Sequence, residues 1–189
     1  DMNGGHDGTK IQMTTNGYAI ASTATEICYS NGTTMPICVV LPKAGESYGS
    51  EINRAYHYSH GAGYHKNRKE FWYPEWAGST IYRYDAKMRY LGGYNSGQGQ
   101  MMQVYGDSDI DAWYSANWGY NTITRRDGLA TNAKWSFNIG STAGSAAVEG
   151  NVVYAMRSSG QTVWKINRDT GGSLGTFNLS GWWPGDTSY

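Results

Sequence analysis

Hydrophobic and polar residues alternate in three short runs in the second half of the chain, and each run leads to an aspartate. The runs read STIYRYD, NTITRRD and TVWKINRD and end at Asp85, Asp127 and Asp169, so that each aspartate follows the previous one by 42 residues. β-Branched or aromatic residues at every second position are typical of a half-buried β-strand. The pattern therefore predicts three equivalent strands, each followed by a chain reversal.

Further short strands surround these runs and recur with the same period. Upstream are EFWYPEW, DAWYSANW and NVVYAMRS, at residues 70–76, 111–118 and 151–158. Downstream are KMRYLGG, KWSFNIG and SLGTFNLSG, and the segments QMMQVYG and SAAVEG lead into the next copy. Four strands per unit, a period near 42 residues and room for four units indicate a β-propeller rather than a sandwich. We expect an all-β fold of about four four-stranded antiparallel blades, with the ring either complete or completed by another chain.

The first unit departs from this pattern. A step of 42 residues back from Asp85 falls on Lys43 in PICVVLPKAG, where the aspartate is missing, and NGYAIAS (16–22) supplies the upstream strand. We therefore divide the chain into three parts. These are a degenerate first blade at 1–69, with an irregular segment at 46–69, regular blades at 70–181 and a tail at 182–189.

The sequence alone does not decide whether the ring closes within one chain. KIQMTT (10–15) is a candidate strand to complete the last blade, and if it does not pair within its own ring it leaves an edge that another chain can extend. Three arrangements follow: a small closed propeller, part of a larger ring, or subunits joined by an exchanged strand. Trp182 and Trp183 in the tail favour the last two, because adjacent indole rings are costly to leave in water and we expect them to dock.

The segment YSANWGYNTITRRD (114–127) resembles the repeat named after its Tyr-Val-Thr-Asn strand, which also runs through Gly and Asn-Thr into a β-branched strand ending in Asp. VVYAMRSSGQTVWKINRDTGG (152–172) is similar to that repeat and to NHL-type and quinoprotein-type blades. The resemblance is good over two blades, fair over a third and poor over residues 1–70. It implies a propeller of a kind found in secreted and surface-layer proteins, and no particular chemistry, because such blades serve scaffolds, adhesins and enzymes alike.

Composition changes the expected core. The chain has only 25 Leu, Ile, Val and Phe residues among 189, but it has 16 Tyr, 8 Trp and 26 Gly. Aromatic rings bury a large area, so we expect them to replace the missing aliphatic core, with glycine in the turns. Lys plus Arg and Asp plus Glu each number 15, and no run of 18 apolar residues exists. Neither nucleic acid nor membrane insertion is therefore expected.

The two cysteines favour an extracellular protein. Cys28 and Cys38 are predicted to form a disulfide across a hairpin whose turn is SNGTTMP, although two reduced and buried thiols fit the same spacing. Asn31 begins a glycosylation sequon in this loop and Asn178 begins a second, so both are candidate glycan acceptors. Together with the heavy use of Tyr, Thr, Ser and Gly, these features predict a secreted, extracellular or cell-surface protein.

The aspartates are interpreted mainly as structural. The three that end the alternating runs are expected to accept backbone N–H groups of the following turn, as Asx turns. Asp107, Asp109 and Asp111 in GDSDIDAW alternate like the start of a calcium loop but lack its Gly and Glu, which leaves them weak metal candidates. The histidines match no metal motif and are interpreted as surface-loop residues. They are His6, His57, His60 and His65.

The functional prediction is a binding or structural role without catalysis. No nucleophile elbow, phosphate loop, dinucleotide fingerprint or zinc-protease helix is present in the sequence, so we expect no enzyme and no cofactor. We expect a structural or adhesive module that self-associates, as in a surface layer or filament, or that docks on another extracellular protein. The alternative is a carbohydrate-binding, lectin-like propeller. Trp76 and Trp118, next to turns, are its candidate stacking platforms, although core packing is the simpler interpretation.

Overall fold

The chain folds into β-strands throughout its described part. The computed structural model describes residues 19–22, 26–30, 37–40, 51–54, 59 and 61–179. These residues form sixteen strands and no helix, which confirms the predicted all-β fold. In the part that is described, no helix is long and apolar enough to cross a membrane.

The strands form four four-stranded antiparallel sheets, each made of four consecutive strands paired in chain order. The first sheet contains β1 (Ala19–Ser22), β2 (Glu26–Ser30), β3 (Ile37–Val40) and β4 (Glu51–Arg54). The second contains β5 (Gly63–His65), β6 (Glu70–Pro74), β7 (Thr80–Asp85) and β8 (Tyr90–Asn95). The third contains β9 (Met101–Gly106), β10 (Ala112–Asn117), β11 (Thr122–Asp127) and β12 (Trp135–Asn138). The fourth contains β13 (Ala143–Glu149), β14 (Val152–Arg157), β15 (Thr162–Asn167) and β16 (Ser173–Asn178).

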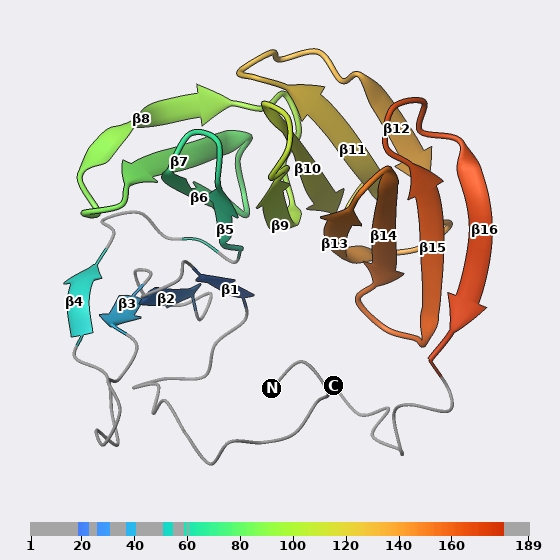
Figure 1. Cartoon of the computed structure of the whole chain (residues 1–189), viewed down its shortest axis with the longest axis horizontal. Helices are drawn as coiled ribbons and strands as arrows, with labels where there is room; N and C mark the ends of the chain where they lie inside the picture. Colours follow the sequence, from blue (N-terminus) through green and yellow to red (C-terminus); the bar gives the residue numbers. More distant parts are fainter. Residues whose placement is uncertain are drawn as a thin grey trace.

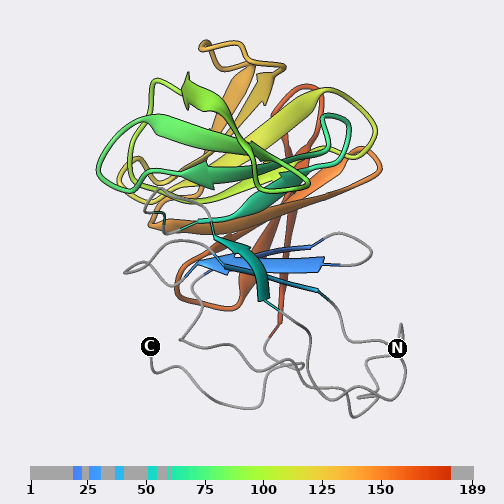
Figure 2. The ribbon, with the colours of Figure 1, turned by 90° about the vertical axis from the view of Figure 1, so that its left-hand side faces the viewer.

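The sheets follow one another around a centre, as the blades of a propeller do. Figure 1 looks down this centre, and the first strands of the blades, β1, β5, β9 and β13, lie on the inner side. β1 contacts β5, β5 contacts β9 and β9 contacts β13, whereas no described strand of the first sheet has a comparable contact with the fourth. The view from the side in Figure 2 places the blue first sheet below the green second sheet. The described strands therefore form an arc of four blades.

The core lies in layers between neighbouring sheets, because successive residues of a strand point to opposite faces. On β6, Phe71 and Tyr73 pack toward the first sheet with Cys28, whereas Trp72 packs on Trp113 of the third sheet. The rings of Trp72 and Trp113 meet edge to face, with their centroids 5.4 Å apart. Aromatic side chains thus fill the spaces on both faces of the second blade, as the composition predicted.

The layer between the third and fourth sheets is more aliphatic. Ile123, Val153 and Ile166 are fully buried there beside Tyr114. On β14, Val153 and Ala155 face the third sheet, so that the one residue between them faces away from it. The fourth blade therefore has one face in the core and one face turned outward from the arc.

The first sheet contains a strand that the sequence did not reveal. NGYAIAS was expected to be the second strand of its blade, but Ala19–Ser22 is the first strand, and the second is Glu26–Ser30. PICVV supplies the third strand, as predicted from its spacing. Cys28 lies opposite Cys38 in the register of β2 and β3, the arrangement that a bridge across this hairpin requires. The disulfide itself stays a prediction.

The segment expected to be irregular, 46–69, contains β4 and β5. Because β5 pairs with β6, the second blade begins at Gly63, before residue 70. Several predicted features lie outside the described residues and stay predictions. They are the candidate closing strand at 10–15, His6, His57, His60, the acceptor Asn31, and Trp182 and Trp183 of the tail.

Candidate functional site

Because neighbouring strands run antiparallel, the connections between them lie alternately at two opposite ends of the blades. The two sets of connections differ in composition. We call "charged end" the turns that follow the first and third strands of the blades, at 66–69, 86–89, 107–111, 128–134, 150–151 and 168–172. We call "aromatic end" the connections that follow the second and fourth strands, at 75–79, 96–100, 118–121, 139–142 and 158–161. The predicted site residues divide between these two ends.

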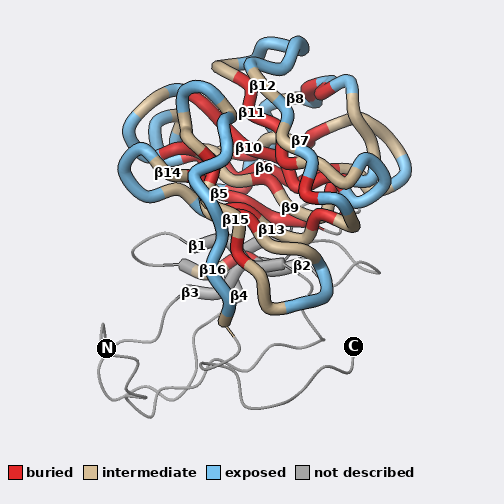
Figure 3. The backbone as a smooth tube through the Cα atoms, turned by 90° about the vertical axis from the view of Figure 1, so that its right-hand side faces the viewer, coloured by how far each residue is buried: buried red, intermediate tan, exposed pale blue. Residues whose placement is uncertain are grey.

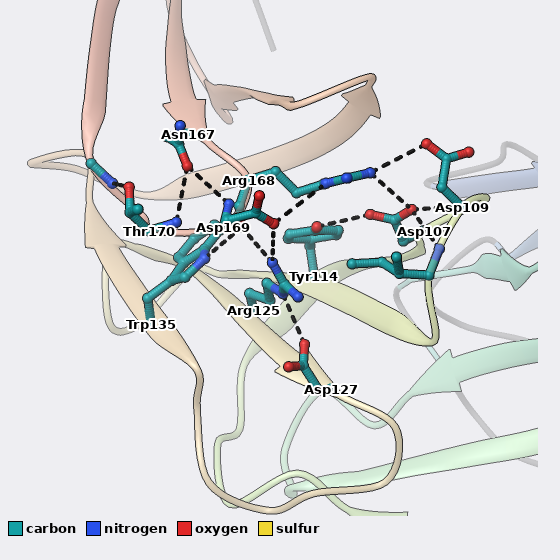
Figure 4. Close-up of polar contacts among 12 residues, drawn as sticks. Asp107, Asp109, Tyr114, Arg125, Asp127, Trp135, Asn167, Arg168, Asp169 and Thr170 are labelled. Atoms are coloured by element: carbon teal, nitrogen blue, oxygen red, sulfur yellow. Dashed lines mark hydrogen bonds and ion pairs between the residues drawn. The ribbon is translucent and has the colours of Figure 1, made fainter.

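At the charged end, the turn 107–111 of the third blade contacts both neighbouring blades. Arg68 of the second blade makes two hydrogen bonds to the Asp111 carboxylate, of 2.7 and 2.6 Å. On the other side, Nη1 of Arg168 from the fourth blade donates to Asp109 Oδ2 at 3.2 Å and lies 3.8 Å from Asp107 Oδ1. The alternating aspartates thus pair with arginines of different blades. Figure 4 shows the contacts of Arg168 with Asp107 and Asp109.

Asp107 is the buried centre of this turn. Its side chain has no exposed surface, and Oδ1 accepts the backbone N–H groups of Asp109 (2.9 Å) and Ile110 (3.3 Å). Oδ2 accepts the hydroxyl of Tyr114 at 3.0 Å. Burial, and then the negative charge of Asp107, raise the pKa of Tyr114, so its hydroxyl stays a donor. Three donors and a nearby guanidinium replace the water that this carboxylate has lost.

Arg125 makes a second set of contacts between the third and fourth blades. Its Nε donates to Asp127 at 2.8 Å, and its Nη1 donates to the Arg168 carbonyl at 2.7 Å and to Asp169 at 3.2 Å. The indole N–H of Trp135 donates to the same Arg168 carbonyl at 2.8 Å. Because Arg125 is nearly buried, removing one of its acidic partners leaves a poorly solvated cation, and we assign this group a role in holding the blades together.

The three aspartates of the repeat do not share one role. Asp85 Oδ1 accepts the N–H groups of Lys87 and Arg89, each at 2.9 Å. Partial burial alone would raise the pKa of Asp85, but these hydrogen bonds and one from the Arg89 side chain outweigh it and lower that pKa. Asp127 instead pairs with Arg125.

After β15 the turn is formed by another residue. Asn167 Oδ1 accepts the N–H groups of Asp169 and Thr170, at 3.0 and 2.9 Å. The expectation that Asp169 makes the Asx turn is therefore wrong. In the register of the sheets Asn167 is the counterpart of Asp85, since each is the last residue of its strand and lies opposite the first paired residue of the preceding strand. Asp169 lies two residues further on and is free to pair with Arg125.

The calcium interpretation of GDSDIDAW is not supported by this geometry. Within the described residues there is no group of three or more His, Cys, Asp or Glu side chains that could hold a metal ion. Asp107 turns inward to Tyr114, whereas Asp111 turns to Arg68 in the other direction. Because the carboxylates point apart and each meets a guanidinium, they do not form a set of converging oxygen ligands.

His65 is buried rather than exposed on a surface loop. It is 1% exposed, and its ring centroid lies 5.0 Å from that of Trp72. Neither ring nitrogen makes a hydrogen bond, and Nε2 lies 3.5 Å from Asp111 Oδ1. Burial lowers the pKa of His65 despite the nearby carboxylates. The prediction of an exposed loop residue is therefore wrong for this histidine.

At the aromatic end, the two tryptophans proposed as stacking platforms lie side by side. The ring centroids of Trp76 and Trp118 are 6.2 Å apart, with an angle of 67° between the rings. Trp118 is 37% exposed, Trp76 is partly buried, and Tyr120 in the same turn as Trp118 is 54% exposed. Trp118 is therefore not a core residue. The 42-residue period places these tryptophans at equivalent positions on neighbouring blades.

Gln100 connects the two tryptophan-bearing turns. Its N–H donates to the Trp76 carbonyl and its own carbonyl accepts the Trp118 N–H, each at 2.9 Å. Its backbone φ of 53° lies in the left-handed region, which costs a non-glycine residue about 1–3 kcal/mol. Gly119 lies against its side chain, since a Cβ there would be 1.6 Å from Gln100 Oε1. An open hollow of about 520 Å3 lies beside this connection.

Sequence reasoning missed the arginines and Gln100. Arg68 pairs with the carboxylate of Asp111, which lies 43 residues away in the sequence and in another blade. A usable signal was present for the others, because Arg125 and Arg168 each lie within two residues of a repeat aspartate. Nothing in the sequence marks Gln100, whose role comes from its backbone conformation.

The comparisons with known proteins show the propeller fold and no family. No protein-family model matches the chain, and no curated protein matches it. Solved structures do match. The WD40 β-propeller domain of Doa1 has a TM-score of 0.61 at 10% identity, covering 87% of this chain and 55% of that one. A chain of the mitotic checkpoint complex has a TM-score of 0.64 at 11% identity, covering 84% and 50%.

A third similar structure is hydrazine synthase of Kuenenia stuttgartiensis. Its TM-score is 0.68 at 12% identity, covering 93% of this chain and 53% of that one. The chain therefore has a β-propeller fold and spans about half the length of the solved chains that it matches. The similarity to the particular secreted repeat families named above stays a resemblance.

Proposed function

We propose that the protein is a non-enzymatic extracellular structural or adhesive module that self-associates, with two copies joining their four-bladed arcs into one ring. The observation that supports this proposal is the incomplete arc. Four blades match about half of larger chains, and no described strand of the first sheet contacts the fourth sheet as neighbouring blades contact each other. Two such arcs contain eight blades, which is within the usual range for closed propellers.

The outward face of the fourth blade has the composition of a blade interface. Tyr154 and Phe177 face away from the third sheet, and their ring centroids are 6.4 Å apart. Phe177 is 43% exposed, and Leu174 on the same strand is 48% exposed. Figure 3 views this side of the molecule, where β16 is exposed along its length. Exposed apolar side chains on the last blade of an arc favour packing against another blade.

A second copy of the chain provides such a blade, and the two copies together close the ring. If the fourth blade of one copy packs on the first blade of the other, a two-fold axis repeats the contact and no blade face remains unpaired. Larger structures, such as a layer or filament, would then be built from this ring.

The test compares two leucines on equivalent outer strands. Leu174 lies on β16 and is 48% exposed, and Leu91 lies on β8 and is 45% exposed. Sedimentation analysis should give a particle of twice 20.8 kDa for the wild-type chain and for Leu91→Ser. The double variant Leu174→Ser/Phe177→Ser should sediment as a monomer. Equal behaviour of both variants would show that the fourth blade is not the contact.

The extracellular location is a separate part of the proposal. Asn178 is exposed at the end of β16, so a glycosyltransferase could reach its sequon. Expression in a secreting eukaryotic cell should give a chain that loses mass after peptide N-glycosidase treatment. A chain with unchanged mass, retained in the cell, would count against this location.

A further inference from the structure

The aromatic end contains a hollow whose lining carries no charge. It has a volume of about 520 Å3 and lies between turns of the second and third blades. Its lining residues are all uncharged, and most of them are small. They are Ala77, Gly78, Ser79, Gly97, Gly99, Gln100 and Tyr120. The lining thus offers backbone groups, two side-chain hydroxyls, an amide and one aromatic ring.

One exposed aromatic ring lines this hollow, and a second exposed ring belongs to the same turn. Tyr120 lines it and is 54% exposed, and Trp118, two residues earlier, is 37% exposed and leans edge-on against Trp76. An indole that keeps more than a third of its surface in water forgoes much of the stabilisation that burial would give it. A ligand that covers these ring faces would recover that stabilisation.

The backbone around the hollow is held in a defined shape. Gln100, in its left-handed conformation, is hydrogen-bonded to the main chains of Trp76 and Trp118, so the two turns cannot move apart independently. Gly99 approaches the carbonyl of Gly78 so closely that a Cβ would lie 3.0 Å from that oxygen. Strained backbone that the surrounding contacts maintain is common at binding sites.

From this geometry we propose that the hollow binds a neutral pyranose sugar, as the end or a side residue of a glycan. The apolar face of the sugar ring packs on Tyr120 and Trp118. Its hydroxyls, which both donate and accept, pair with the Gln100 amide, the Ser79 hydroxyl and the backbone of the glycine-rich turns. The inference does not depend on the assembly proposed above, because these residues belong to the second and third blades.

The charge distribution selects the class of ligand. No cation lines the hollow, and the carboxylate of Glu75 lies against Gly78, where a Cβ would be 2.2 Å from Glu75 Oε2. An acidic sugar or a phosphate would therefore meet a negative group and no compensating one. A peptide is the less suitable occupant, because a hollow of this size holds a single ring more readily than a stretch of chain.

The experiment measures binding of defined glycans to the full chain. The probes are neutral oligosaccharides of glucose, galactose, mannose and N-acetylglucosamine, with heparin and polygalacturonate as acidic probes and a mixed peptide library as the third arm. We expect at least one neutral series to bind and to change the tryptophan fluorescence, and we expect the acidic probes and the peptides not to bind. Binding confined to acidic sugars or to peptides, or no binding to any neutral sugar at millimolar concentration, would overturn the proposal.

Matched variants locate the site. Trp118→Ala and Tyr120→Ala should each weaken sugar binding about tenfold or more, since each removes a ring that stacks on the ligand. Tyr90→Ala is the control, because Tyr90 is 49% exposed but is the first residue of β8, next to the turn 86–89 of the charged end. It should leave the affinity unchanged. Equal loss in the control, or unchanged affinity in both site variants, would place the sugar elsewhere and overturn the assignment, provided that thermal melts show folded proteins.

Discussion

The charged end and the aromatic end of the same blades use their polar residues in opposite ways. At the charged end, Asp107, Asp109 and Asp111 pair with Arg68 and Arg168 from the blades on either side. At the aromatic end, Glu75 is the only charged residue in the connections 75–79, 96–100, 118–121, 139–142 and 158–161. The cluster of carboxylates at the charged end therefore holds the blades together. The neutral aromatic end, with its exposed rings, has the composition of a binding surface.

The difference also appears in the backbone. The charged end satisfies its buried carboxylate with donors, so Asp107 has three hydrogen-bond partners. The aromatic end keeps Gln100 in a left-handed conformation and leaves Trp118 partly in water. The charged end thus gains stability from its polar groups. The aromatic end gives up some stability through the conformation of Gln100 and the exposure of Trp118, as is expected at a functional site.

The largest effect should come from the buried carboxylate of the charged end. Asp107→Ala leaves the Tyr114 hydroxyl and two backbone N–H groups without their acceptor, and we expect the free energy of unfolding to fall by about 3 kcal/mol. Asp109→Ala is the matched control, since Asp109 is 57% exposed and pairs with Arg168, the arginine that also lies near Asp107. It should cost about 0.5 kcal/mol or less. Urea unfolding measures both, and similar losses in the two variants would remove the distinction between them.

A smaller effect, which depends on pH, should come from His65. Because burial lowers its pKa, the unfolded chain takes up a proton below about pH 6.5 that the folded chain resists, and stability is lost as the pH falls. The slope from this group is at most about 1.4 kcal/mol per pH unit. The carboxylates of Asp111, Glu70 and Asp107 raise the pKa of His65 and so limit the shift, whereas the charge of Arg68 lowers that pKa further.

The variant His65→Gln isolates this contribution. Unfolding measured between pH 7.5 and 5 should show a shallower loss of stability for His65→Gln than for the wild-type chain. The carboxylates that titrate in both proteins cancel in the difference. Parallel pH profiles would show that His65 is not kept neutral by its surroundings.

The smallest stability effect should come from Gln100, and its sign should be opposite. Gln100→Gly keeps both backbone hydrogen bonds and relieves the left-handed strain, so we expect the free energy of unfolding to rise by about 0.5–1 kcal/mol. The same variant removes the amide that lines the hollow and should weaken sugar binding. A stabilised protein with unchanged sugar affinity would show that the amide does not contact the ligand.

The blade pattern could be predicted because it is local. The alternation of hydrophobic and polar residues along β7, β11 and β15, with a turn after each strand, can be read directly from the sequence. The 42-residue period follows from it. β2 was missed because it is short. β1 was predicted as a strand but was given the wrong position in its blade, because the missing aspartate after β3 removed the marker that fixed the phase of the other blades. Cys28 and Cys38 come opposite each other, as the hairpin prediction required.

The sites were only partly predictable. Trp76 and Trp118 are one period apart, so the repeat implies that they are neighbours, and their centroids lie 6.2 Å apart. The arginine pairs could not be predicted, because Arg168 meets Asp109 across 59 residues and a blade boundary. Asp169 was misassigned because the 42-residue spacing matched it by letter, whereas the strand register matches Asn167.

The proposal that the arc of four blades is completed by a second copy is tested most directly by the mass of the native particle. Native mass spectrometry of the wild-type chain, over a dilution series, should give a discrete species of twice 20.8 kDa that persists to low concentration. A species of 20.8 kDa at every concentration would contradict the account, because the outward face of the fourth blade would then have no partner from this chain.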